Sequence, residues 1–134
     1  NPAGYTQVTP LTGILNYYDQ EGHLIQKTSG LITFNYTYLY GNLIKMEQIK
    51  NGSVELTTNY TYTDKKDLRV DGLDWELGKR STNLVATETV TGTGGPVSTT
   101  SYNYVTDSYG RVTEMVTSDG KLNKTTTYTY FEDK

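Results

Sequence analysis

The stretch TTTYTYF, residues 125–131, places tyrosine at every second position, and related stretches occur three more times. They are FNYTY from Phe34, TNYTYT from Thr58 and SYNYV from Ser101. A period of two is that of a β-strand, in which successive side chains point to opposite faces of the sheet. Each stretch therefore predicts a strand with one aromatic face and one face of hydroxyl-bearing side chains.

The composition also favours a β fold. Of 134 residues, 13 are tyrosine and 2 are phenylalanine, and threonine is more frequent than either. Thr and Tyr suit strands because their side chains fit a pleated, half-buried surface. Hydrophobic residues make up 34% of the chain, which is less than in most globular domains, but they alternate instead of being scattered. We expect one folded β domain over residues 1–134, since this length suits a single core.

Glycine-containing turns separate the predicted strands at hairpin intervals. Asn51-Gly52 and Asp119-Gly120 are dipeptides that favour the primed two-residue turns of β-hairpins. The short distance from Gly41 to Gly52 leaves room for only one strand between successive turns. Neighbouring strands are therefore expected to be antiparallel.

The order of strands and turns indicates an internal repeat of about 30 residues. We predict repeat units at about residues 15–30, 34–63 and 101–131, with an insert at residues 64–100. The predicted fold is all-β, an antiparallel meander of about eight or more strands built from Tyr-rich hairpins. At most one short helix is expected, near residues 72–80.

No predicted helix is long enough to cover a sheet of this size. A sheet with one solvated face must bury the other, so we expect it to curl into a strongly curved sheet or half-barrel. Tyrosine suits the inner face because its ring buries a large apolar area while its hydroxyl still reaches water. The repeated tyrosines are therefore predicted to form the core or the lining of the curled sheet.

Two turn segments resemble the tyrosine–aspartate repeats of large bacterial shell proteins, in which Asp-x-x-Gly-Arg precedes a hydrophobic residue. In YVTDSYGRVTEM, which starts at Tyr104, the motif is matched from Asp107 to Val112. In YYDQEGHLIQK, which starts at Tyr17, it is matched from Asp19, with His23 in place of the arginine.

The wider order of the chain resembles a domain of unknown function found in secreted lipoproteins of Bacteroidetes. Tyr-rich hairpins are followed by LGKRSTNLVATET, residues 77–89, and then by a final Tyr-rich hairpin, so that the resemblance starts at about Leu15. It implies a curved, porin-like antiparallel sheet, and it brings no catalytic residues to carry over to this chain. It also implies an extracytoplasmic protein, in the periplasm or at the cell surface. We expect a lipoprotein whose signal and anchor are not among residues 1–134.

Charge and motifs argue against several classes of function. The formal net charge is −3 and the basic residues are dispersed, so nucleic acid is not an expected partner. No apolar run approaches the roughly 18 residues of a membrane span. With no cysteine and one histidine, the chain has no disulfide, no cluster of metal ligands and no nucleophile–base pair. We expect no catalytic residue, metal or cofactor.

Three classes of function remain open. We favour a non-enzymatic module that binds a glycan or other small ligand on the tyrosine face, with Tyr40, Tyr109 and Trp75 as candidate ligand-binding residues because they lie beside turns or in the insert. The alternative is a structural module that docks another protein of a cell-envelope assembly through a sheet edge. An enzyme would need glutamates that meet across strands as in glycosidases. The candidates for such a pair are Glu47, Glu55, Glu88 and Glu114.

Overall fold

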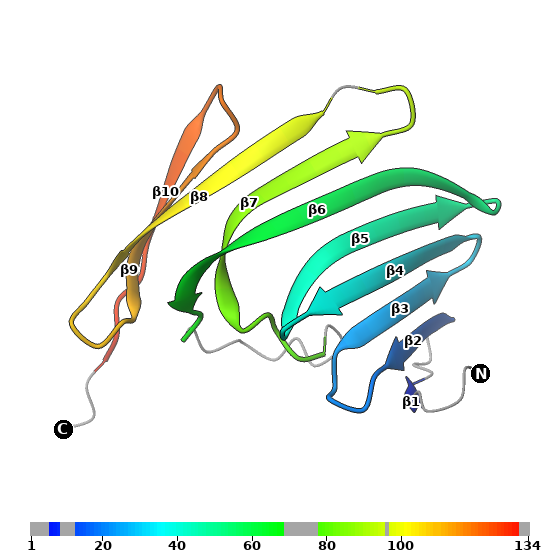
Figure 1. Ribbon diagram of the computed structural model, residues 1–134, viewed down its shortest axis with the longest axis horizontal. Helices are drawn as coiled ribbons and strands as arrows, with labels where there is room; N and C mark the ends of the chain where they lie inside the picture. Colours follow the sequence, from blue (N-terminus) through cyan, green and yellow to red (C-terminus); the bar gives the residue numbers. More distant parts are fainter. Residues whose placement is uncertain (1–5, 9–12, 69–77, 96, 132–134) are drawn as a thin grey trace.

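The computed structural model describes residues 6–8, 13–68, 78–95 and 97–131, which form one antiparallel sheet (Figure 1). Ten strands are hydrogen-bonded in the order in which they occur in the sequence, so the topology is a meander. This confirms the predicted all-β meander of eight or more strands. The strands are β1 (Thr6–Val8), β2 (Ile14–Tyr18), β3 (Leu24–Ser29), β4 (Ile32–Leu39), β5 (Asn42–Lys50), β6 (Ser53–Lys66), β7 (Asn83–Gly92), β8 (Ser98–Thr106), β9 (Val112–Ser118) and β10 (Asn123–Thr127).

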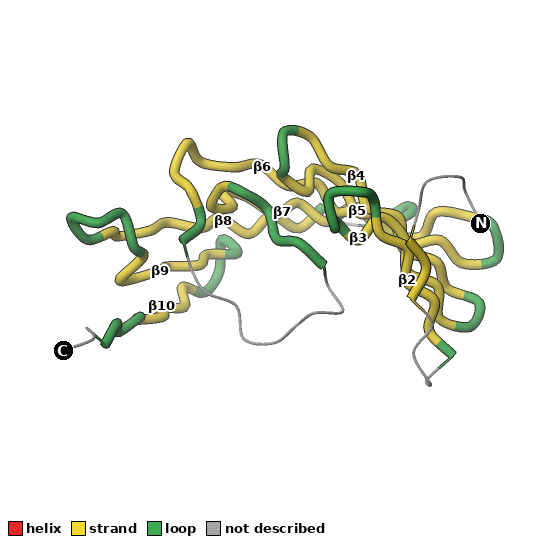
Figure 2. Tube along the Cα trace, turned by 90° about the horizontal axis from the view of Figure 1, so that it is seen from below, coloured by secondary structure: helices red, strands yellow, loops and turns green. Residues whose placement is uncertain are grey.

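The sheet is open, because β1 and β10 lie at its two edges and do not pair with each other. Figures 1 and 2 show that it twists and curls along its length, as expected for a strongly curved sheet or half-barrel. The described residues contain no helix, and hence none that is long and apolar enough to cross a membrane. Of the short helix expected near residues 72–80, residues 72–77 lie outside the described residues.

Bulges give the sheet much of its curvature. One extra residue interrupts the pairing near the start of β3, β5, β7 and β9. In β5, for example, Tyr38 pairs with Leu43 while Thr37 pairs with Lys45, so Ile44 is the extra residue. A bulge bends its strand and increases the local twist. The four bulges recur at the same place in successive hairpins, so the bending of the strands recurs along the sheet.

Two of the turns have a primed geometry. Asn51 and Gly52 have φ values of 51° and 78°, as a type I′ turn requires, and this prediction is confirmed. Tyr40 and Gly41 form a similar turn, with φ values of 51° and 76°. A positive φ is unfavourable for tyrosine, so Tyr40 occupies this place at some cost in conformational energy.

The primed turn predicted at Asp119-Gly120 is wrong. Ser118 pairs with Asn123, so four residues connect β9 to β10, and only Gly120 among them has a positive φ. The Asp119 carboxylate accepts the backbone N–H of Leu122 at 2.9 Å. Such a side-chain bond stabilises a longer loop, and it competes with the two-residue turn.

Few apolar side chains of the described residues are fully buried. Leu24, Leu84 and Val112 are 2%, 0% and 1% exposed. The tyrosines of the paired strands are half-buried instead. Of the two sequence-based alternatives, core or lining, the structure therefore gives the lining of a curled sheet.

Candidate functional site

The register of the strands brings the tyrosines of β4 and β6 onto one face. Tyr36 pairs with Met46, which pairs with Thr58, and directly opposed residues share a face of the sheet. Tyr60 and Tyr62 follow Thr58 at intervals of two and therefore lie on the same face. The alternation seen in the sequence thus places tyrosines of neighbouring hairpins on the same face of the sheet, on either side of β5.

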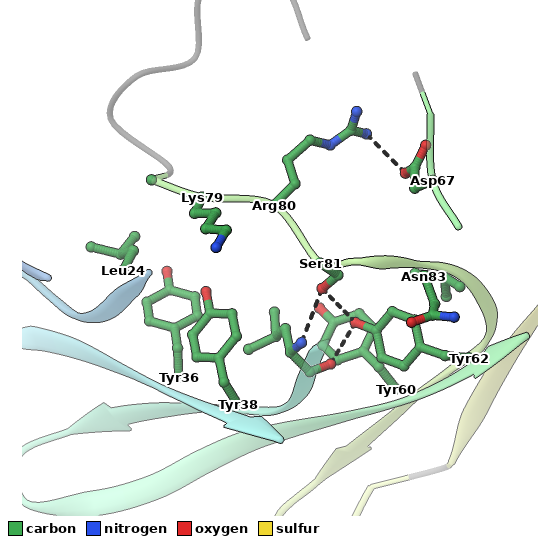
Figure 3. A pocket seen from close by; sticks show the side chains of 13 residues that line it. Leu24, Tyr36, Tyr38, Tyr60, Tyr62, Asp67, Lys79, Arg80, Ser81 and Asn83 are labelled. Carbon is green, nitrogen blue, oxygen red and sulfur yellow. Dashed lines mark hydrogen bonds and ion pairs between the residues drawn. The ribbon is translucent and has the colours of Figure 1, made fainter. Parts of the chain in front are cut away.

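This surface forms the floor of a pocket with a volume of about 440 Å³ (Figure 3). That volume lies within the range of small-molecule sites. Strands supply the aromatic rings of the lining, and its charged side chains come from residues outside the strands. The lining residues are Leu24, Tyr36, Tyr38, Leu43, Tyr60, Tyr62, Asp67, Gly78, Lys79, Arg80, Ser81, Asn83 and Val85.

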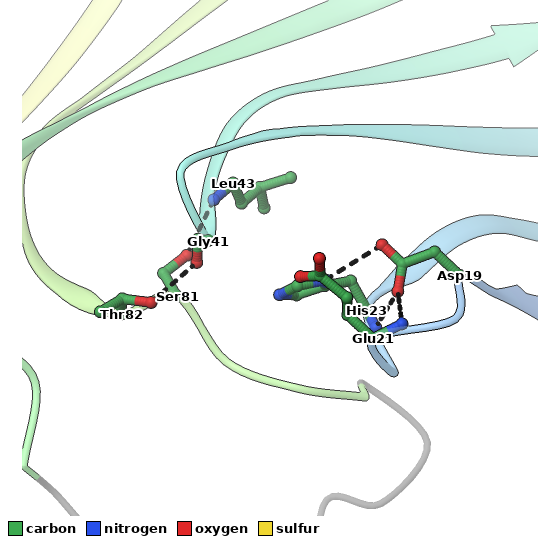
Figure 4. A network of polar contacts seen from close by, with 7 residues as sticks. All are labelled: Asp19, Glu21, His23, Gly41, Leu43, Ser81 and Thr82. Atoms are coloured by element: carbon green, nitrogen blue, oxygen red, sulfur yellow. Dashed lines mark hydrogen bonds and ion pairs between the residues drawn. The ribbon is translucent and has the colours of Figure 1, made fainter.

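Residues 78–83, which we call the covering segment, form the opposite wall of the pocket. Backbone hydrogen bonds attach the segment to two hairpin turns, from Lys79 N–H to the Gly22 carbonyl at 2.8 Å and from Thr82 N–H to the Gly41 carbonyl at 3.0 Å. The Ser81 hydroxyl accepts the N–H of Leu43 at 2.9 Å (Figure 4). These bonds join residues 38 to 57 positions apart in the sequence, so the position of the wall depends on the tertiary fold.

One tyrosine hydroxyl of the pocket is used to hold the fold together. Tyr62 donates to the Leu43 carbonyl at 2.6 Å and lies 2.9 Å from the Ser81 hydroxyl. Two further tyrosines make the equivalent bond elsewhere in the sheet, from Tyr104 to the Val85 carbonyl at 2.8 Å and from Tyr130 to the Val112 carbonyl at 2.7 Å.

All three acceptors precede the extra residue of a bulge. A bulge disrupts the regular ladder of backbone bonds, and the second tyrosine of the next Tyr-x-Tyr pair supplies a donor there. In these three Tyr-x-Tyr pairs, the second tyrosine therefore stabilises the fold by bonding a backbone carbonyl beside a bulge.

The other three tyrosine hydroxyls of the pocket are not used in this way. Tyr36, Tyr38 and Tyr60 line the cavity, and none of their hydroxyls has a hydrogen-bond partner among the described residues. Burial raises the pKa of Tyr38 and Tyr60 to about 12, and it raises the pKa of Tyr36 as well. These hydroxyls therefore remain protonated at physiological pH, and each can donate one hydrogen bond and accept others.

The charged side chains of the described lining are Asp67, which directly follows β6, and Lys79 and Arg80 of the covering segment. Arg80 turns away from the tyrosines toward Asp67, and their nearest nitrogen and oxygen atoms are 3.6 Å apart (Figure 3). Lys79 points the other way, with its amino group above the hydroxyl ends of Tyr36 and Tyr38.

The two Asp-x-x-Gly turns have the same hydrogen bonds. In each turn, one carboxylate oxygen of the aspartate accepts two backbone N–H groups. The other carboxylate oxygen contacts the side chain of the fifth residue of the motif. The distance is 3.0 Å from Asp19 to His23 Nδ1 and 2.8 Å from Asp107 to Arg111 Nε. Burial raises the pKa of both aspartates, but these hydrogen bonds outweigh it, and both pKa values lie below the ordinary value.

The fifth side chain of each turn then stacks on a tyrosine. The His23 ring lies 4.6 Å from the Tyr38 ring, and the Arg111 guanidinium lies 4.7 Å from the Tyr130 ring and 5.1 Å from the Tyr109 ring. His23 is 2% exposed, and its Nε2 atom has no hydrogen-bond partner within the part of the chain that the structure describes. His23 thus packs against Tyr38, although it does not itself line the pocket.

The residues predicted from the sequence to bind a ligand do not form this pocket. Tyr40 and Tyr109 are 90% and 74% exposed, as expected beside turns, but neither lines the cavity. Trp75 lies outside the described residues. The sequence alone did not separate the pocket tyrosines from the others, because all share the Tyr-x-Tyr pattern.

The glutamates considered for a glycosidase pair are not cross-strand partners of one another in the described sheet. Glu47 pairs with Asn35 and Thr57, and Glu88 pairs with Tyr60 and Thr100. Glu88 instead accepts a hydrogen bond from the Tyr102 hydroxyl at 3.3 Å. Among the described residues there is also no group of three or more His, Cys, Asp and Glu side chains placed to hold a metal ion.

No protein-family model matches the chain, and neither does any curated protein. Among solved structures, the chain is similar to a porin-like protein from Bacteroides uniformis ATCC 8492, with 13% sequence identity. The match covers 95% of this chain and 72% of that chain, with a TM-score of 0.42. A likeness this distant carries no functional argument.

Proposed function

We propose that this protein is a non-enzymatic β-sheet module that binds a small polar ligand, such as a glycan, in its tyrosine-lined pocket. The observation that supports the proposal is that the tyrosine hydroxyls of the pocket fall into two groups, one bonded within the fold and three not. The Tyr62 hydroxyl is hydrogen-bonded to the Leu43 carbonyl of the fold. The hydroxyls of Tyr36, Tyr38 and Tyr60 line a cavity of about 440 Å³, and they have no hydrogen-bond partner among the described residues. Polar groups that converge on a pocket and are not used by the fold are those that orient a ligand.

Saccharides match this chemistry. A sugar ring presents several hydroxyls that can exchange hydrogen bonds with protonated phenols. Its apolar C–H surface can pack on the aromatic rings. The Tyr38 ring packs against the His23 ring. Tyr60 lies on β6, which is paired with a strand on each side. These side chains are therefore already restricted, and little side-chain entropy remains to be lost on binding.

Calorimetric titration with a panel of mono- and oligosaccharides tests the proposal. Tyr36→Phe and Tyr60→Phe each remove one hydroxyl, and each variant is expected to bind about two- to tenfold more weakly, as the loss of one hydrogen bond predicts. Tyr40→Phe is the matched control, because Tyr40 is exposed outside the pocket. Binding that both pocket variants retain in full, or a panel with no ligand at all, would refute the proposal.

Protein docking is the second candidate, and the open sheet favours it. β10 is an edge strand, and most of its residues are exposed. Such an edge can accept a strand from a partner. Docking at β10 would be insensitive to Tyr60→Phe, so a pull-down with the wild-type chain and this variant distinguishes the two functions.

We also propose that the protein works outside the cytoplasm, as a secreted protein or lipoprotein. The support is the resemblance of its Tyr-rich hairpins to a domain of secreted Bacteroidetes lipoproteins. Fractionation of cells that produce the full gene product is the test. Recovery in the cytoplasmic fraction alone would contradict the location.

A further inference from the structure

Lys79 is the cation that faces the tyrosines of the pocket. Its amino group lies above the hydroxyl ends of Tyr36 and Tyr38 (Figure 3). Among the described residues it has no carboxylate partner and no hydrogen bond to its side chain. Its neighbour Arg80 is turned away from the tyrosines and lies 3.6 Å from Asp67. The two adjacent cations therefore have different surroundings.

Among the described lining residues, the basic side chains outnumber the acidic ones by one. Among the described residues of the lining, Asp67 is the only acidic one, and it lies opposite Arg80, so Lys79 has no acidic counterpart there. The described lining thus carries two basic side chains and one acidic side chain, within a chain of formal net charge −3. A local excess of positive charge attracts an anionic ligand and orients it as it approaches.

The hydroxyls beside Lys79 suit the same kind of ligand. Three protonated phenols donate hydrogen bonds as readily to a carboxylate oxygen as to a sugar hydroxyl. A hydrogen bond or ion pair to a charged oxygen is stronger than one to a neutral oxygen. The pocket therefore offers one site for a charge and several for hydroxyl groups.

We infer that the ligand is an acidic saccharide, whose carboxylate pairs with Lys79 while its ring hydroxyls engage Tyr36, Tyr38 and Tyr60. The inference rests on the proposed function, because it takes the tyrosine pocket as the ligand site. It adds the class of ligand, and it gives Lys79 the role of selecting charged sugars over neutral ones.

Nuclear magnetic resonance titration of the ¹⁵N-labelled protein can test the class of ligand. The probes are methyl β-D-glucuronide, methyl β-D-glucoside and sodium acetate, which separate the acidic sugar from its neutral analogue and from a simple anion. The uronide is expected to bind about fivefold more tightly than the glucoside, as for one partly exposed ion pair. Acetate is expected to bind more weakly than either sugar.

Two variants then assign the preference to one residue. Lys79→Gln is expected to bind the uronide and the glucoside equally, with binding of the glucoside unchanged. Lys50→Gln is the matched control. It removes the same charge from an exposed position at the far end of β5, and it is expected to keep the preference because screening weakens distant charges.

The outcomes separate the inference from the proposed function. Equal binding of both sugars to the wild-type pocket, or a preference that survives Lys79→Gln, would overturn the acidic ligand and leave the saccharide site intact. Stronger binding of acetate than of the uronide would also overturn it. If neither sugar perturbs the pocket residues, both the inference and its premise are refuted for these sugars.

Discussion

Replacing Tyr62 with phenylalanine would remove a single oxygen atom that joins three parts of the protein. The Tyr62 hydroxyl on β6 lies 2.6 Å from the Leu43 carbonyl on β5 and 2.9 Å from the Ser81 hydroxyl of the covering segment. Its one proton goes to Leu43, so Ser81 is the donor of the second bond. The ring would remain, so the change isolates the hydrogen bonds from the packing.

The expected loss of stability follows from these two bonds. A hydrogen bond contributes about 0.5–1.5 kcal/mol net, and a buried group left without its partner costs more than that. The pairing of β5 with β6 begins at Lys45, so this ladder supplies no replacement donor for Leu43. We expect Tyr62→Phe to lower the free energy of unfolding by about 1–3 kcal/mol. At roughly 3–5 °C per kcal/mol for a chain of this size, the melting temperature should fall by about 3–15 °C.

Tyr60→Phe is the control, because Tyr60 is half-buried on the same strand and face but its hydroxyl has no partner among the described residues. We expect this variant to unfold within about 0.5 kcal/mol of the wild type. Thermal and urea unfolding followed by circular dichroism measure both effects. The reasoning fails if Tyr60→Phe destabilises the protein as much as Tyr62→Phe, or if Tyr62→Phe has no effect.

Three further results are expected. Tyr40→Ala should leave the melting temperature nearly unchanged in a thermal scan, because this side chain is 90% exposed, and a large fall would show that it packs on the sheet. Gly78→Ala should lower the free energy of unfolding in urea by roughly 1–3 kcal/mol. Gly78 has a φ of 69°, and a Cβ there would lie 2.7 Å from the Gly22 carbonyl oxygen. An unchanged free energy would mean that the covering segment is free to shift. The pKa of Asp107 is lowered in the fold, so the contribution of its carboxylate to stability is complete above about pH 4 and is lost as the pH falls through the folded pKa. Asp107→Asn should therefore flatten the acid side of the stability–pH curve. An unchanged curve would contradict a stabilising role for the Asp107 hydrogen bonds.

The sequence was sufficient for the class of fold and for most of the turns. The tyrosine alternation predicts strands with one aromatic face, and Tyr60 and Tyr62 do lie together in the pocket. Asn51-Gly52 forms the predicted primed turn. These features are local, so propensity and period are enough to predict them.

The candidate site could not be predicted from the sequence because its contacts are not local. The covering segment meets the turn at Gly41 through bonds that span about 40 residues. The bulges place an extra residue such as Ile44 without any mark in the hydrophobic pattern. The sequence therefore favoured exposed aromatic residues such as Tyr40 as binding residues, whereas the unused hydroxyls belong to half-buried tyrosines.

Tyrosine-selective ¹³C labelling would test the central claim most directly. Each of the 13 tyrosines gives its own signal, which is assigned by Tyr→Phe substitution and followed during titration with the tightest-binding saccharide. We predict that the signals of Tyr36, Tyr38 and Tyr60 move together with one dissociation constant, while those of Tyr40 and Tyr109 stay in place. Movement of Tyr40 and Tyr109 with the three pocket signals unchanged would contradict the account.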